Sequence, residues 1–210
     1  MHAPRKQASQ ARSRATRSAI LEAAARILET RGAAGLNTNA IAWRAGVSIG
    51  SLYQYFPNKE AILAELIREK RAQLLDWMHQ AEAETRDAAP AQALRALVRA
   101  GLRHQFERPE LALEVEYLEQ RLELAPETAA LAETMAKLIL TALRRYRPDA
   151  GMAEARDCVA ISKGLINAAA LSGETGGPGL TARAERAVLG YLSYSEEKRA
   201  DSRPASSSKP

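Results

Sequence analysis

Apolar residues recur along most of this chain at intervals of three and four, the spacing that places side chains on one face of a helix. The first such stripe consists of Ile20, Ala23, Ala24, Ile27 and Leu28. Alternating runs of β-branched residues between turn residues, which are typical of strands, are missing from the sequence. We therefore expect an all-α fold of about nine helices.

The composition indicates a globular chain. Of the 210 residues, 46% are hydrophobic and 26% are charged, and Cys158 is the one cysteine, so no internal disulfide can form. The strongly apolar stretches fall far short of the roughly 20 residues that a membrane span needs, and residues 1–17 have no apolar core for a secretion signal. The sequence therefore predicts a cytoplasmic protein with no membrane partner.

The positive charge is concentrated at one end of the chain. The formal net charge is +5, yet residues 1–75 hold 12 Lys and Arg against 5 Asp and Glu, whereas residues 76–195 hold 14 against 17. A basic amino-terminal third favours a polyanionic partner there, with nucleic acid as the first candidate and an acidic membrane surface as the second. A solvated basic face is the more common origin of such a pattern, so charge alone does not decide.

Residues 37–56 contain the capping and helix-ending residues expected of two short helices joined by a tight turn. Asn37 or Thr38 can cap the first helix, Gly46 ends it, Ser48 can cap the second, and Pro57 closes that one. This arrangement is typical of a helix-turn-helix, whose second helix lies in the DNA major groove. Four residues open the second helix, where free backbone N–H groups and small hydroxyls can face phosphates or base edges; they are Ser48, Ile49, Gly50 and Ser51.

The rest of the chain is predicted to be helical with unstructured ends. A long helix follows Asn58, and further candidates are residues 90–107, 109–123, 126–147, 151–172 and 180–195. Residues 1–13 and 196–210 are too polar to bury a core, so we expect a disordered basic arm and a disordered tail. The arm's cations, with those just after it, raise nonspecific DNA affinity or enter the minor groove; they are Arg5, Lys6, Arg12, Arg14 and Arg17.

The segment from Asn37 to Leu63 reads NTNAIAWRAGVSIGSLYQYFPNKEAIL. It resembles the DNA-binding signature of the tetracycline-repressor (TetR/AcrR) family of bacterial transcriptional regulators. The elements IAxxAGVS, GSLYQYF and PNKEAIL stand in order and without gaps. The resemblance implies a three-helix DNA-binding domain over residues 14–75 and a helical ligand-binding and dimerisation domain over residues 76–195.

The resemblance also implies roles for single residues. Asn37 and Thr38 are expected to contact phosphates and Asn39 to reach a base, while Lys59 is expected to be a further phosphate anchor. The groove-facing set is expected to comprise Ser48, Ile49, Gly50, Ser51 and Tyr53, with Tyr55 offering a second phenol. One of the two tyrosines can instead serve chiefly to pack. Trp43 departs from the family, whose members usually carry a polar residue there.

The function implied is that of a ligand-responsive repressor that binds a palindromic operator as a homodimer. The apolar stripes of residues 159–170 and of the last helix fit either a dimeric four-helix bundle or the core of their own domain. The sequence does not identify the effector or the residues that bind it. The alternative is a constitutive or architectural DNA-binding protein without an effector.

An enzyme receives little support from the sequence. His2, His79 and His104 lie far apart, and there is no Cys/His metal spacing, glycine-rich phosphate loop or GxSxG elbow. We therefore expect no catalytic residue, no metal site and no cofactor.

Overall fold

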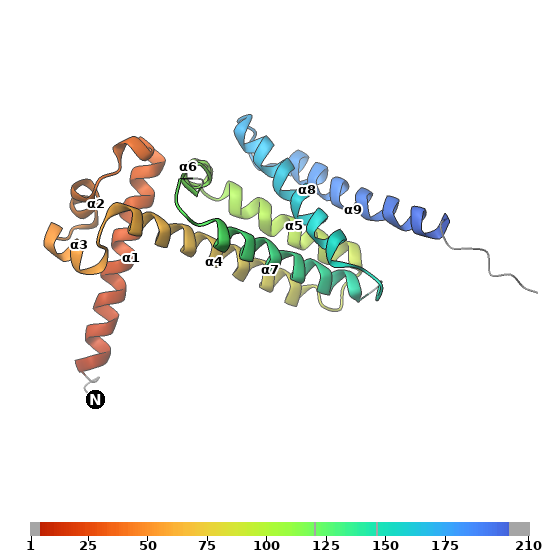
Figure 1. Cartoon of the computed structure of the whole chain (residues 1–210), viewed down its shortest axis with the longest axis horizontal. Coiled ribbons are helices and arrows are strands. Elements are labelled where there is room, and N and C mark those ends of the chain that lie inside the picture. Colours follow the sequence, from red (N-terminus) through yellow and green to blue (C-terminus); the bar gives the residue numbers. More distant parts are fainter. Residues whose placement is uncertain (1–4, 120, 146, 202–210) are drawn as a thin grey trace, which may run out of the picture. The chain divides into compact units, whose positions relative to one another are not determined.

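The computed structural model describes residues 5–119, 121–145 and 147–201, and every regular element in them is a helix (Figure 1). The elements are α1 (Arg5–Arg31), a 3₁₀ turn (Ala33–Gly35), α2 (Thr38–Ala45), α3 (Ile49–Tyr55), α4 (Lys59–Glu84), α5 (Pro90–Phe106), α6 (Pro109–Glu119), α7 (Ala125–Arg144), α8 (Met152–Leu171) and α9 (Pro178–Asp201). The predicted all-α fold is therefore confirmed. Most helices begin and end within a few residues of the boundaries predicted from the prolines and glycines.

The chain forms two compact units that differ from a simple division at residue 75. The head unit contains residues up to Gln73 together with Glu107–Ala129. The body unit contains Leu74–Phe106 together with the chain from Ala130 onward. Helix α6 thus belongs with the helix-turn-helix, although its residues lie within the range 76–195 that the sequence assigned to the second domain.

Packing explains why α6 joins the head unit. Leu111 of α6 is fully buried, and Leu118 is 7% exposed, in a core shared with Ile20 of α1, Leu52 of α3 and Ile62 of α4. This core is continuous, so the short helices α2 and α3 are held by α1, α4 and α6 together. The helix-turn-helix is therefore one face of a larger packed unit.

Charge pairs add to the attachment of α6. The guanidinium of Arg108, one residue before α6, donates from Nε to Glu29 Oε1 at 2.5 Å and from Nη1 to Glu22 Oε2 at 2.9 Å. The hydrogen bond from Arg108 holds the pKa of Glu29 below its usual value despite partial burial. Both acids lie on α1, so these pairs join the start of α6 to that helix.

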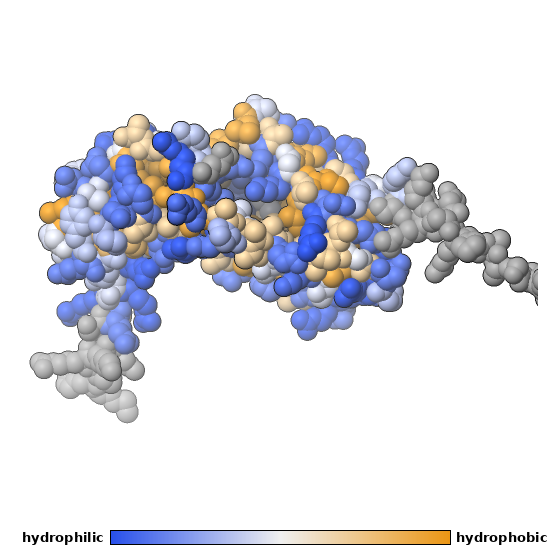
Figure 2. All heavy atoms as spheres, in the orientation of Figure 1, coloured by the Kyte–Doolittle hydropathy of each residue, from blue (hydrophilic) through white to orange (hydrophobic). Residues whose placement is uncertain are grey.

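The amino-terminal arm differs from the prediction of disorder over residues 1–13. Helix α1 begins at Arg5, and the described side chains from Gln10 to Thr16 are largely exposed and hydrophilic (Figure 2). Arg, Lys, Gln and Ala are good helix formers, and extending a helix already nucleated by packing adds one hydrogen bond per residue. The absence of apolar residues therefore predicts exposure but not the loss of helix. At the other end α9 extends to Asp201, and residues 1–4 and 202–210 lie outside the described part.

The body unit has its own core. Helix α5 packs against α8 and α9, and buried side chains of these helices include Leu97, Cys158 and Val188. Burial raises the pKa of the Cys158 thiol to about 12, so it stays protonated and behaves as a small apolar group. None of the helices in the described ranges combines the length and apolar character that crossing a membrane requires.

Candidate nucleic-acid interface

Side-chain caps and one glycine define the helix-turn-helix. Asn37 Oδ1 accepts from the backbone N–H of Ala40 at 2.9 Å, and Ser48 Oγ accepts from that of Ser51 at 3.0 Å. Between the two helices Gly46 adopts φ 68° and ψ 30°, a left-handed conformation that a residue with a Cβ rarely takes. The predicted starts of α2 and α3 and the turn between them are therefore confirmed.

Buried apolar residues hold α2 against α3. Ile41 and Leu52 are both 0% exposed, and Phe56, just after α3, is 3% exposed. The guanidinium of Arg17 lies 5.5 Å from the centre of the Phe56 ring and pairs with Glu65 of α4 at 2.6 Å. Arg17 thus contributes to the internal structure of the head unit, while its side chain remains 49% exposed.

A hydroxyl pair joins the outer surfaces of the two short helices. Thr38 Oγ1 and Tyr53 Oη lie 3.2 Å apart, and Tyr53 remains 51% exposed. Thr38 begins α2 and Tyr53 lies in the middle of α3, so the expected phosphate contact and the expected groove residue form one continuous polar surface. The contact restrains the phenol, and a restrained side chain loses less entropy when a ligand binds it.

The first turn of α3 offers donors and open space. Ser48 and Ser51 hydroxyls lie 2.8 Å apart, and the N-terminal N–H groups of α3 point the same way as in any helix start. A Cβ on Gly50 would have only Ser48 Oγ within 4 Å, at 3.9 Å. No packing inside the head unit therefore demands glycine at this position, and a close external surface remains a reason for it.

The remaining predicted site residues fall into exposed and partly buried groups. Asn39 is exposed on α2, Ile49 is 39% exposed at the start of α3, and Lys59 is exposed as the first residue of α4. Tyr55 is half-buried and packs against the core of the head unit, so of the two tyrosines it is the one that chiefly packs. Asn37 uses its carbonyl oxygen as the cap, which leaves its amide nitrogen available as a donor.

Two further residues of this surface were not in the predicted set. Gln54 is exposed on α3, four positions after Gly50 and therefore on the same helix face. Trp43 is 83% exposed on α2, four positions after Asn39. The helical period, counted outward from buried Leu52 and Ile41, would have identified both as surface residues.

Three comparisons relate the chain to known proteins. Residues 20–66 match the family described as "Bacterial regulatory proteins, tetR family". A curated relative, the "Fatty acid metabolism regulator protein" of Bacillus subtilis (strain 168), is 37% identical over 79 residues, which are 38% of this chain and 39% of the relative. The chain thus matches well under half the length of that relative.

Solved structures share the fold over nearly the whole chain. A TetR family transcription regulator from Marinobacter aquaeolei VT8 has a TM-score of 0.66 at 20% identity, covering 87% of this chain and 97% of that one. A transcriptional regulator from Rhodococcus sp. Rha1 has a TM-score of 0.71 at 22% identity, covering 85% and 96%. Residues 20–66 are therefore similar to the tetR family of bacterial regulatory proteins, and the fold over most of the chain is similar to that of solved TetR-family transcriptional regulators.

Proposed function

We propose that the chain represses transcription by binding a palindromic DNA operator as a homodimer, with α3 of each copy in the major groove. The observation that carries this is the exposed start of α3, where Ser48, Gly50 and Tyr53 lie over a fully buried helix-turn-helix core. In a helix-turn-helix dimer the two recognition helices meet half-sites about 34 Å apart or a multiple of it. Because the DNA lies inside the cell, the proposed location is the cytoplasm.

The body unit supports the proposal of a dimer. Leu171 at the end of α8 is 74% exposed, and Tyr194 of α9 is 61% exposed. Leu171 is the last residue of α8 and Tyr194 lies in the second half of α9, so the two exposed side chains lie near opposite ends of this pair of packed helices. A second copy of the same unit packed along both helices would cover them and form a four-helix bundle. A small-molecule effector that binds the chain and favours one separation of the two heads would then control operator binding.

The proposal is tested by measuring binding to the protein's own promoter region. At about physiological salt we expect the operator to bind roughly a thousandfold or more tightly than random DNA of the same length, as specific regulators do. Titration with salt then separates the phosphate contribution from the base contribution. Equal affinity for both DNAs would contradict a regulator and favour an architectural DNA-binding protein. A metabolite that raises the melting temperature and releases DNA would distinguish a gated regulator from a constitutive one.

Lys59→Gln is expected to weaken binding to operator and random DNA by similar factors. Lys59 begins α4, is exposed, and is proposed to contact a phosphate, which carries no sequence information. The slope of log affinity against log salt is expected to fall by about one per lost contact. The matched control is Lys137→Gln, an exposed lysine of α7 in the body unit, which is expected to leave both quantities unchanged. An unaltered salt slope in Lys59→Gln would remove this residue from the interface.

A further inference from the structure

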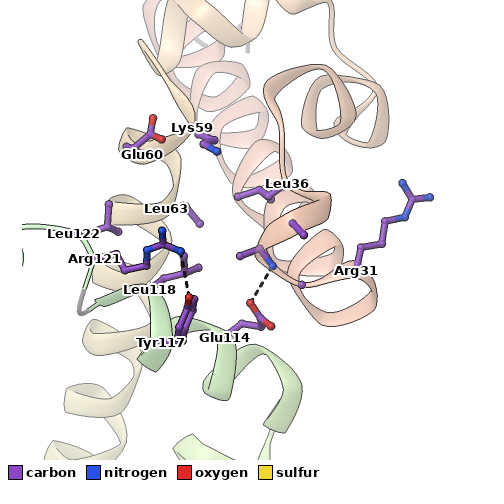
Figure 3. Close-up of a pocket in the computed structure, with 13 residues that line it drawn as sticks. Arg31, Leu36, Lys59, Glu60, Leu63, Glu114, Tyr117, Leu118, Arg121 and Leu122 are labelled. Carbon is purple, nitrogen blue, oxygen red and sulfur yellow. Dashed lines mark hydrogen bonds between the residues drawn. The ribbon is translucent and has the colours of Figure 1, made fainter.

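A pocket of about 630 Å³ lies within the head unit (Figure 3), and no residue of α3 is among those that line it. Three segments line it: the end of α1 with the 3₁₀ turn, the first turns of α4, and the end of α6 with the residues after it. Its volume falls within the range of small-molecule sites, about 300–1,000 Å³. All of its lining residues belong to the head unit, so the pocket does not depend on the body unit.

The pocket has an apolar side. Leu36, Leu63, Leu118 and Leu122 line it, and the first three are nearly buried. Tyr117, which is 56% exposed, adds an aromatic ring to this surface. The leucines and the ring can cover a short alkyl or aryl body, and its transfer from water would contribute to affinity.

The same pocket holds cations that lack an acidic partner. Several arginines of the head unit pair with carboxylates, as Arg68 does with Glu127 and Arg71 with Glu119. Arg121 differs, because its Nη1 donates to the Tyr117 hydroxyl at 3.2 Å and its guanidinium lies 5.6 Å from that ring. Among the side chains that the structure describes, neither Arg121 nor Lys59 has a carboxylate within ion-pair distance.

The two acids of the lining differ in availability. Glu114 is occupied, since its Oε2 accepts from the backbone N–H of Ala33 at 3.0 Å and its Oε1 approaches Gly32 closely. Glu60 is exposed in the first turn of α4 and opposes an anion by its charge. Figure 3 shows Arg31 turned away from the other lining side chains, so the cations considered for the pocket are Arg121 and Lys59.

We propose that this pocket binds an organic anion with a short apolar body, whose charged group pairs with Arg121 and Lys59 while its body lies on the leucines. The regulatory part of this proposal rests on the proposed function, in which Lys59 anchors a DNA phosphate. The Lys59 ammonium group can then pair with either the bound anion or a DNA phosphate, so anion binding and DNA binding oppose each other. By linkage the opposition is reciprocal, and each ligand weakens the other by the same factor.

Octanesulfonate is a suitable probe, because its sulfonate stays ionised and its chain is short enough for the pocket. Binding is measured first by calorimetry on the full chain without DNA, with 1-octanol as the uncharged analogue and octyltrimethylammonium as the cation. We expect one octanesulfonate per chain and at least about tenfold weaker binding of the other two, as loss of a charge-assisted contact implies. Absence of octanesulfonate binding, or equal binding of all three, would overturn the pocket assignment.

Three variants locate the bound probe. Arg121→Gln is expected to weaken octanesulfonate binding about tenfold, whereas Glu60→Gln is expected to strengthen it roughly twofold to fivefold by removing a repelling charge. Lys137→Gln in the body unit is expected to leave it unchanged. Thermal melting of each variant verifies that it folds. Binding that is the same in Arg121→Gln and Glu60→Gln as in the unsubstituted chain would place the anion elsewhere and overturn the proposal.

Operator binding then tests the coupling. Octanesulfonate at saturation is expected to weaken operator affinity and to lower its salt slope, and Arg121→Gln is expected to shift this effect to higher probe concentration. If the chain binds no operator at all, the proposed function fails while the calorimetric result for the pocket stands. If the operator binds but saturating octanesulfonate leaves its affinity unchanged, the competition for Lys59 is contradicted.

Discussion

Gly50→Glu is expected to lower operator affinity more than about 100-fold while the protein stays folded. Gly50 lies in the first turn of α3 in open space, where a Cβ meets nothing closer than Ser48 Oγ at 3.9 Å. The fold can therefore accept a side chain there, and a glutamate is even favoured at a helix start. On DNA, the same carboxylate would face phosphates and base acceptors, and its repulsion would be added to the steric conflict.

Gly50→Ala separates the two effects. It is expected to raise the melting temperature slightly, because alanine is a better helix former by up to about 1 kcal/mol, and yet to weaken operator binding. The matched control is Gly179→Glu in the first turn of α9, another glycine where an added Cβ would meet nothing within 4 Å. Operator affinity and melting temperature are measured for all three. Normal operator affinity in Gly50→Glu would remove the start of α3 from the DNA interface.

Leu111→Ala is expected to lower the free energy of unfolding by about 3 kcal/mol, within the usual 2–5 kcal/mol for a buried leucine. Leu111 is 0% exposed in the core that α6 shares with α1 and the helix-turn-helix. The cavity left by the truncation would loosen the support of α2 and α3, so operator affinity is expected to fall as well. Urea denaturation gives the stability, with an unchanged slope as the sign that two-state unfolding persists.

Leu113→Ala is the matched control for this change. Leu113 lies on the same helix two positions away, is only half-buried, and lies outside the packed core of the head unit. Its truncation is expected to lower the free energy of unfolding by no more than about 1 kcal/mol. If the two variants were equally stable, α6 would not be an integral part of the head.

Local chemistry explains what could be predicted from the sequence. Helix caps and tight turns involve only residues that are close in sequence. The types and spacing of Asn37, Gly46 and Ser48 therefore suffice to place α2 and α3. The exposure of Tyr53 and the packing of Tyr55 depend instead on what lies beside α3. The sequence therefore identified the candidate surface but did not decide which tyrosine belongs to it.

Long-range contacts explain what could not be predicted. Nothing in the local pattern of α6 indicates that Leu111 packs with Ile20, more than ninety positions earlier, or that Glu114 caps the backbone of Ala33. Partner choice among carboxylates is equally nonlocal, and it decides that Arg17 is paired while Arg121 is not. These long-range contacts bring together the residues that line the anion pocket, so the sequence alone does not predict the pocket.

The placement of α6 bears on how such proteins can be recombined. The head is not one continuous piece of sequence, because residues 74–106 of the body interrupt it between Gln73 and Glu107. A single genetic crossover near residue 75 would join this helix-turn-helix to a foreign α6 and leave its core without Leu111 and Leu118. An intact head requires both segments together, so the candidate DNA-binding surface and the helix that supports it must be inherited as a pair.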